Sequence, residues 1–200
     1  MSGSSLCPAV NIRWRFTVEE LILVDTQDES VGQAEKMDVH RQGLLHRAFS
    51  IFIFDRQGRL LLQQRALGKY HSQGLWTNTC CGHPRPGERT VEAAKRRLIE
   101  EMGLMCDLLE VHAFIYHEQV TNDLIEHEYD HVYVGQSAVD PQANPEEALD
   151  WKWVTLTELA RDITDEPQAY TVWFRKILKE QGIDAVRIWR DVLTGLGAGQ

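Results

Sequence analysis

Side chains that could hold an anionic ligand gather in one short stretch of the sequence, residues 82–104. Glycine, leucine and charged residues stand in this stretch at definite intervals, at Gly82, Glu88, Arg96, Leu98, Glu100, Glu101, Gly103 and Leu104. If residues 90–102 form a helix, Arg97 and Glu101 lie four residues apart on one face. A guanidinium, whose N–H fork matches phosphate geometry, and a carboxylate, which binds divalent cations, could then contact the same ligand.

A second pair of carboxylates stands at Glu126 and Glu128. Side chains two residues apart project from one face of a strand, so these carboxylates can converge. Converging carboxylates can bind a metal ion or act as acid and base. The adjacent Cys80 and Cys81 add thiols that could carry a proton, although a buried cysteine usually acts as a small apolar residue.

The elements that must position these residues follow from hydrophobic patterns and turn residues. A glycine- and proline-rich loop over 66–89 leads into a helix over 90–102, which Gly103 closes. Mixed strands with a central helix and two late helices predict an α/β fold in which a mixed sheet lies between helices. The other expected elements are strands at 20–25, 48–54, 59–64 and 151–154, a hairpin of 112–119 with 124–137, and helices at 156–163 and 166–181.

Composition limits the class of protein. The chain has 200 residues, of which 43% are apolar, and a net charge of -9, which argues against a nucleic-acid groove. No apolar run approaches the roughly 20 residues that span a bilayer, and the first residues lack the pattern of a secretory signal. Four cysteines without a disulfide framework favour the cytoplasm. We expect a weakly ordered arm over 1–17, one domain over 18–185 and a tail over 186–200.

Residues 82–104 resemble the Nudix box, a loop–helix–loop that holds magnesium and a diphosphate. The resemblance implies a Nudix-type fold. The chain departs from the box at one position, because Arg97 stands where the hydrolases carry the first glutamate of an Arg-Glu pair. This departure weakens the interpretation as a hydrolase.

Over roughly residues 18–180 the chain resembles the type I isopentenyl-diphosphate isomerases, a group within the Nudix superfamily. The resemblance implies isomerisation of isopentenyl diphosphate to dimethylallyl diphosphate, by protonation and deprotonation, in isoprenoid biosynthesis. The similar pieces are Lys36–His40, Leu45–Ser50, Gln64–Lys69, Trp76–Pro84, Tyr116, Glu126–Glu128 and Trp173.

The same resemblance implies one metal site of three imidazoles and two carboxylates, formed by His40, His46, His83, Glu126 and Glu128. Such mixed ligands suit manganese, magnesium or zinc, and the sequence does not choose among them. Some family members have one more residue between the first two histidines, and we expect the loop here to absorb the difference. The remaining histidines are expected to be surface or core residues: His71, His112, His117, His127 and His131.

The resemblance also implies catalytic and substrate-binding residues. Cys81, Glu128 and Tyr116 match the catalytic set, and Trp173 matches a tryptophan that faces a carbocation. Cys80 should point away from Cys81 if the segment is extended. The diphosphate would be bound by a magnesium ion on Glu101 and by four cations, Lys36, Arg65, Lys69 and Arg97.

Two other functions stay open. A Nudix hydrolase of a nucleoside diphosphate derivative is favoured by Glu100 and Glu101, but it does not require the His and Glu set. A non-catalytic binding module would keep the fold, but it has no need of both Cys81 and Glu128. The isomerase interpretation implies a small-molecule substrate and neither a nucleic acid nor a membrane as partner, and it leaves the oligomeric state open.

Overall fold

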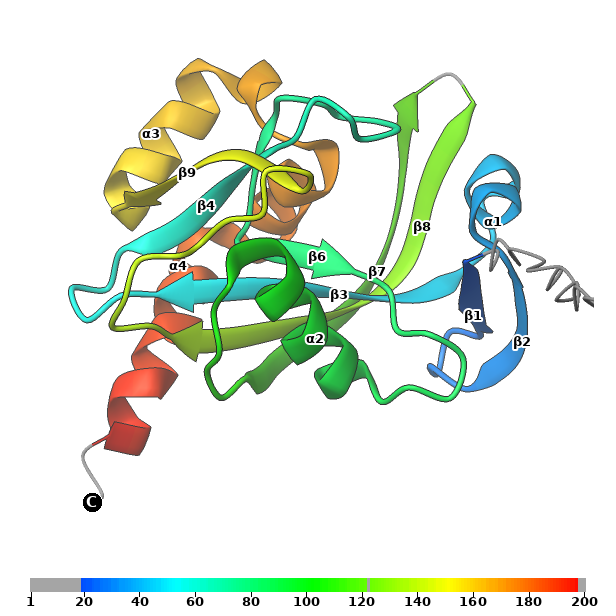
Figure 1. Cartoon of the computed structure of the whole chain (residues 1–200), viewed down its shortest axis with the longest axis horizontal. Coiled ribbons are helices and arrows are strands. Elements are labelled where there is room, and N and C mark those ends of the chain that lie inside the picture. Colours follow the sequence, from blue (N-terminus) through cyan, green and yellow to red (C-terminus); the bar gives the residue numbers. More distant parts are fainter. Residues whose placement is uncertain (1–18, 122, 198–200) are drawn as a thin grey trace, which may run out of the picture.

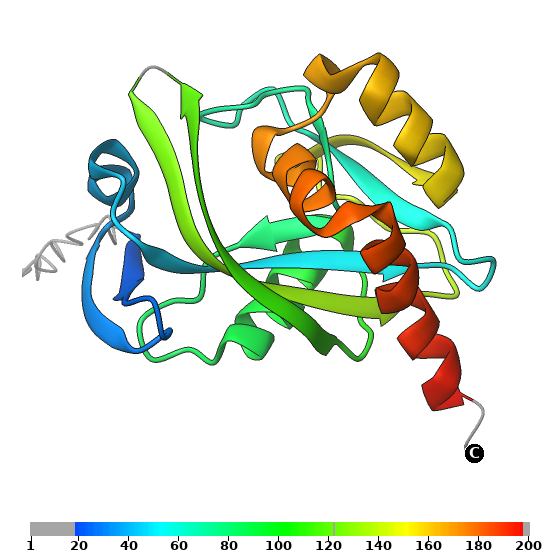
Figure 2. The same ribbon diagram turned by 180° about the vertical axis from the view of Figure 1, so that it is seen from behind.

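The computed structural model describes residues 19–121 and 123–197. The expected arm over 1–17 lies outside the described residues. A nine-stranded mixed sheet runs through the molecule. Helix α2 (Thr90–Met102) covers one face of the sheet, and helix α4 (Val172–Gly197) covers the other (Figures 1 and 2). The predicted fold class, a mixed sheet between helices, is therefore confirmed.

The centre of the sheet is β3, which pairs antiparallel with β1, β4 and β6 and parallel with β8. The predicted strands and the predicted hairpin are confirmed. Strand β2 was not predicted, because its side chains are largely exposed and show no alternation of apolar and polar residues. Strands β5 and β6 are short and lie inside the stretch that was expected to be a loop. The strands are β1 (Glu20–Val24), β2 (Ser30–Glu35), β3 (His46–Phe54), β4 (Leu60–Arg65), β5 (Trp76–Thr77), β6 (Cys80–Gly82), β7 (Leu109–Thr121), β8 (Leu124–Gln136) and β9 (Ala148–Val154).

The helices are α1 (Lys36–Gln42), α2, α3 (Leu156–Asp165) and α4, with a 3₁₀ turn before α4 at Pro167–Ala169. Gly182 interrupts α4 with a φ of 79°, where the sequence placed the helix end. The helix then continues and buries Val186 and Trp189 in the core, so the folded part extends past residue 185 into the expected tail. None of the helices in residues 19–121 and 123–197 has the length and apolar character needed to cross a membrane.

The side chains of β3 alternate between two apolar cores. Phe49 and Ile51 pack with α2, whereas Phe52 and Phe54 pack with α4. The neighbouring strand β6 follows the same alternation. It directs one cysteine into the α2 core and turns the next toward the α4 side, where the candidate site lies.

Gly103 ends α2 in the left-handed conformation, with a φ of 63°. A Cβ at this position would lie 2.8 Å from the carbonyl oxygen of Gln142. We expect Gly103→Ala to lower the free energy of unfolding by more than the roughly 1–2 kcal/mol that a left-handed alanine costs. Gly87→Ala is the matched control, because Gly87 has a φ of 81° but open space around its Cβ position. Urea denaturation measures both variants, and equal losses would contradict the steric argument.

Candidate metal centre and active site

Five side chains from separate parts of the chain converge in one cluster. Their ligand atoms all lie within 4.8 Å of one another, and four of the five side chains are buried. Both glutamates project from one face of β8, as the sequence predicted. The parallel register of β3 and β8 sets His46 beside Glu128. The cluster consists of His40 on α1, His46 on β3, His83 after β6, and Glu126 and Glu128 on β8.

Two of the imidazoles have a fixed tautomer. His40 donates from Nδ1 to the carbonyl oxygen of Lys36 at 2.7 Å, and His46 donates from Nδ1 to the carbonyl oxygen of Leu44 at 2.9 Å. A carbonyl oxygen can only accept, so Nδ1 carries the proton in both rings. In the neutral rings Nε2 is then unprotonated and faces the cluster, which is the arrangement that a metal-binding histidine requires.

The facing atoms of the cluster suit a cation between them. His46 Nε2 lies 3.2 Å from His83 Nε2, and His83 Nε2 lies 3.0 Å from a carboxylate oxygen of Glu128. His40 Nε2 and Glu126 Oε2 are 3.2 Å apart and buried, yet neither atom has a hydrogen-bond partner within the described part of the chain. Buried polar atoms are normally satisfied. A divalent ion that accepts nitrogen and oxygen ligands would satisfy these atoms together.

Three of the cluster side chains have pKa shifts that agree with this fit. The fourth shift is that of His40, for which burial lowers the pKa but contacts with Glu126 outweigh burial and raise it. Burial lowers the pKa of His83 well below its usual value, and the nearby charges of His46 and Lys36 lower it further. Burial raises the pKa values of Glu126 and Glu128, but contacts with the histidines outweigh burial and the net shift is downward for both. His83 is therefore neutral and both carboxylates are ionised near neutral pH, as metal ligands must be.

A pocket of about 870 Å³ opens beside the cluster. Most of the predicted site residues line this pocket. The exceptions are His40 and His46, which are fully buried behind its wall. The predicted residues that line it are Lys36, Arg65, Lys69, Cys81, His83, Arg97, Glu101, Tyr116, Glu126, Glu128 and Trp173.

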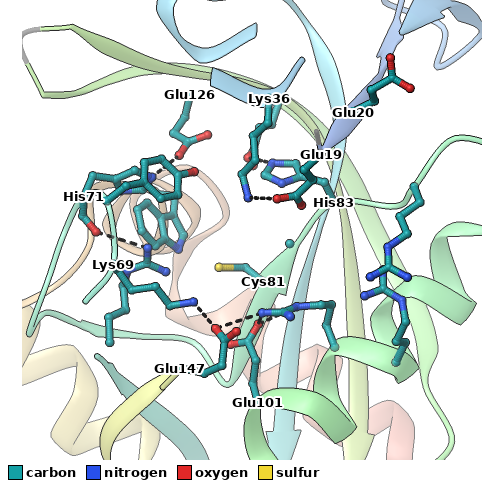
Figure 3. Close-up of a pocket in the computed structure, with 18 of the residues that line it drawn as sticks. Glu19, Glu20, Lys36, Lys69, His71, Cys81, His83, Glu101, Glu126 and Glu147 are labelled. Carbon is teal, nitrogen blue, oxygen red and sulfur yellow. Dashed lines mark hydrogen bonds and ion pairs between the residues drawn. The ribbon is translucent and has the colours of Figure 1, made fainter. Parts of the chain in front are cut away.

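The proton-carrying groups meet at the inner wall of the pocket. Tyr116 on β7 stands opposite Glu128 in the antiparallel register and donates its hydroxyl to Glu128 Oε2 at 2.6 Å. Burial raises the pKa values of the Cys81 thiol and the Tyr116 hydroxyl, so both stay protonated at neutral pH. In Figure 3 the Cys81 sulfur points into the pocket, with His83 and Glu126 on one side and Glu101 on the other. Cys80 is fully buried in the α2 core, as expected.

Three of the four predicted diphosphate-binding cations are paired with carboxylates, among them Lys36, which lies 3.0 Å from Glu19. Arg97 donates to Glu101 at 2.6 Å and lies 3.1 Å from Glu147, which also pairs with Lys69 (Figure 3). Arg65 has a buried Nε without a hydrogen-bond partner among the described residues, so it keeps one donor for a ligand. The sequence gave no signal for Glu147, because it precedes β9 in an irregular segment without a recognised motif.

Comparisons with known proteins agree with this geometry. Residues 44–176 match the NUDIX domain family. Over 171 residues, 86% of this chain and 96% of the relative, the sequence is 57% identical to the isopentenyl-diphosphate Delta-isomerase of Serratia proteamaculans (strain 568). Over 175 residues, 88% of this chain and 99% of the relative, it is 52% identical to isopentenyl-diphosphate Delta-isomerase 2 of Photorhabdus laumondii. The chain belongs to the isopentenyl-diphosphate Delta-isomerases of the Nudix superfamily.

Solved structures of more distant sequences show a similar fold. A Deinococcus radiodurans protein is similar with a TM-score of 0.66 and 23% identity, over 80% of this chain and 98% of its own. The MutT protein of Methanosarcina mazei is similar with a TM-score of 0.56 and 19% identity, over 72% of this chain and 95% of its own. At these identities the comparison describes the fold alone, and the chemistry must be argued from the site.

Trp173, in the first turn of α4, forms part of the wall of the pocket. Its side chain is buried, and its Nε1–H donates to Thr77 Oγ1 at 2.9 Å, which fixes the indole plane. The guanidinium of Arg65 lies 5.0 Å from the ring centroid. The indole therefore already has a cation over its face, a contact to which tryptophan is well suited.

His71 is a residue of this site that sequence reasoning missed. We expected it to be an ordinary surface or core residue, but it is buried and its Nε2 lies 3.2 Å from Glu126 Oε1. Its ring also meets that of Trp173 edge to face, with 5.6 Å between centroids. His71 lies in an irregular loop between β4 and β5, so no periodic pattern could have placed it in the site.

Proposed function

We propose that this protein converts isopentenyl diphosphate to dimethylallyl diphosphate. The observation that carries the proposal is the meeting of a protonated thiol, Cys81, and an ionised carboxylate, Glu128, in a pocket that also holds cations for a diphosphate. Membership of the isomerase family supports the same reaction. The substrate is a small molecule, and the proposal needs neither a nucleic acid nor a membrane.

The chemistry follows from the substrate. An unactivated alkene has no carbonyl group to stabilise a carbanion, so the double bond moves by protonation to a tertiary carbocation and loss of a neighbouring proton. That route requires an acid and a base at the reacting carbons. We assign the acid to the Cys81 thiol and the base to Glu128. Tyr116 holds Glu128 in place by its hydrogen bond and can assist proton transfer. One proton is added and one is removed, so the reaction needs no oxidant or reductant.

We propose two places for divalent ions in this site. His40, His46, His83, Glu126 and Glu128 would hold one ion, for which manganese, magnesium and zinc are all suitable. Glu101 would hold a magnesium ion together with the diphosphate. When bound, these ions supply positive charge, the first beside Glu128 and the second beside the phosphates.

The diphosphate end of the substrate would be bound by the cations on the pocket wall. Lys36, Arg65, Lys69 and Arg97 come from four different parts of the chain and all face the pocket. Lys69 and Arg97 share the carboxylate of Glu147, so a diphosphate would compete with that carboxylate for them. Charge-assisted hydrogen bonds of this kind are among the stronger ones in proteins.

We place the enzyme in the cytoplasm, and a reducing compartment fits the proposed mechanism. Cys80, Cys81 and Cys106 are free thiols. The proposed acid, Cys81, must stay reduced to carry its proton. Thiols persist in the cytoplasm, whereas oxidising compartments favour disulfides.

We expect Trp173→Phe to lower kcat by up to about tenfold and Trp173→Ala to lower it by about 10–30-fold, because a desolvated cation–aromatic contact contributes about 1–2 kcal/mol. The alanine variant should also lose about 3–5 kcal/mol of stability from the cavity. Trp189→Phe is the matched control, since Trp189 is buried on the same helix but does not line the pocket. The kcat and the denaturation midpoint are measured on all three variants. A wild-type kcat for Trp173→Phe would show that Trp173 has a purely structural role.

The function itself is tested by a two-substrate assay. The protein is incubated with magnesium and either isopentenyl diphosphate or a nucleoside diphosphate sugar. The first reaction should yield an acid-labile product, because dimethylallyl diphosphate is an allylic ester and its precursor is not. The second reaction should release no phosphate or nucleotide. Cleavage of the nucleotide without isomerisation would instead support the hydrolase alternative.

A further inference from the structure

His71 is a buried side chain in a loop whose other residues are mostly exposed or half-buried. The loop joins β4 to β5 and includes Leu67 and Tyr70, which are 68% and 42% exposed, whereas His71 is only 3% exposed. Figure 3 shows the His71 ring turned into the pocket toward Glu126. His71 is not one of the five converging metal-ligand groups, so its burial needs another explanation.

Both ring nitrogens of His71 have polar neighbours. Nε2 lies 3.2 Å from Glu126 Oε1, and Nδ1 lies 3.2 Å from the hydroxyl oxygen of Ser72. An ionised carboxylate can only accept, so Nε2 donates to Glu126, and the Ser72 hydroxyl can act as the partner of Nδ1.

These contacts divide the two oxygens of Glu126 between different partners. Oε1 is held by His71, whereas Oε2 lies 3.2 Å from His40 Nε2, inside the metal cluster. A carboxylate with one oxygen restrained in this way presents the other in a fixed direction. Outer partners of metal ligands commonly have this effect.

His71 also connects the metal cluster to the substrate-binding side of the pocket. Its main-chain carbonyl accepts a hydrogen bond from Arg65 Nη2 at 3.3 Å, and its ring contacts the Trp173 indole. Through His71, the loop between β4 and β5 therefore contacts the proposed metal ligand Glu126, the proposed diphosphate-binding residue Arg65 and the aromatic ring of Trp173.

We propose that His71 is a positioning residue that orients Glu126 toward the metal ion and holds the loop between β4 and β5 against the site. The proposal rests on the metal centre of the proposed function. His71 is not among the five converging ligand side chains and contacts one of them, Glu126, so its effect should be seen first in metal affinity.

The test uses the affinity of the metal-stripped protein for Mn²⁺, measured by competition with a chelator. His71→Phe keeps a ring but removes the donor, and we expect it to weaken Mn²⁺ binding by about 10–100-fold. His71→Gln restores an N–H donor and should recover most of that loss. His131→Phe is the matched control, because His131 lies 2.8 Å from the carboxylate of Glu110 but lines no part of the 870 Å³ pocket. It should bind Mn²⁺ like the wild type.

His71→Leu, which is smaller than phenylalanine, replaces His71→Phe if the larger ring prevents folding. Wild-type Mn²⁺ affinity in the Phe or Leu variant would overturn the proposal, and so would a Gln variant that loses as much affinity as Phe. If the wild-type protein itself bound no Mn²⁺, magnesium or zinc, the metal centre would be overturned together with this inference. Loss of isomerisation without loss of metal affinity in His71→Phe would count against the role toward Glu126.

Discussion

Replacing Cys81 with alanine should lower kcat by about 100–10,000-fold, the range that a general acid contributes. The thiol points into the pocket and is kept protonated by burial, so alanine removes the proton donor and little else. Metal content and the denaturation midpoint should stay close to those of the wild type, because Cys81 is not among the converging metal ligands. Steady-state rates with isopentenyl diphosphate, elemental analysis and urea denaturation measure the three quantities.

Cys80→Ala is the matched control for this prediction. Cys80 is fully buried and packs against α2, so its loss should reduce stability and leave kcat nearly unchanged. If Cys80→Ala lost activity and Cys81→Ala kept it, the acid would have been assigned to the wrong cysteine.

Loss of a single imidazole from the cluster should remove the bound metal and the activity together. We expect His40→Ala, His46→Ala and His83→Ala each to lower kcat by more than about 100-fold, because each leaves an open position in the proposed five-ligand site, to which Glu128 belongs. Elemental analysis of the purified variants, set beside their rates, is the measurement.

An exposed histidine provides the comparison for the metal ligands. His117 lies on β7 with its side chain exposed, so His117→Ala should keep both metal and activity. Full metal occupancy in all three cluster variants would show that these histidines do not share an ion.

Local patterns predicted much of the fold and the convergence of the two carboxylates on β8. The period of the helical pattern and its closing glycine predicted α2 with the bounds that the structure has. The spacing of Glu126 and Glu128 correctly placed both carboxylates on one face of β8. The shorter interval between His40 and His46 is absorbed as expected, since Gly43 ends α1 in the left-handed conformation and the chain turns directly into β3.

Contacts that depend on tertiary structure could not be predicted in this way. His71 and Glu147 reach the pocket from irregular segments, where side-chain direction has no period. The seven residues of α1 are too few for a clear helical pattern. The last helix was predicted over 166–181. It begins later, at Val172, and Val186 and Trp189 provide enough apolar contact to continue it beyond the break at Gly182.

The most direct test of the proposed reaction is proton NMR of isopentenyl diphosphate incubated with the protein and magnesium in D₂O. If the double bond moves by protonation and deprotonation, dimethylallyl diphosphate should form and its new methyl group should carry deuterium acquired from solvent through the exchangeable acid. Cys81→Ala should show neither change. Unaltered isopentenyl diphosphate, or release of inorganic phosphate or diphosphate in its place, would contradict the assignment of this protein as an isopentenyl-diphosphate isomerase.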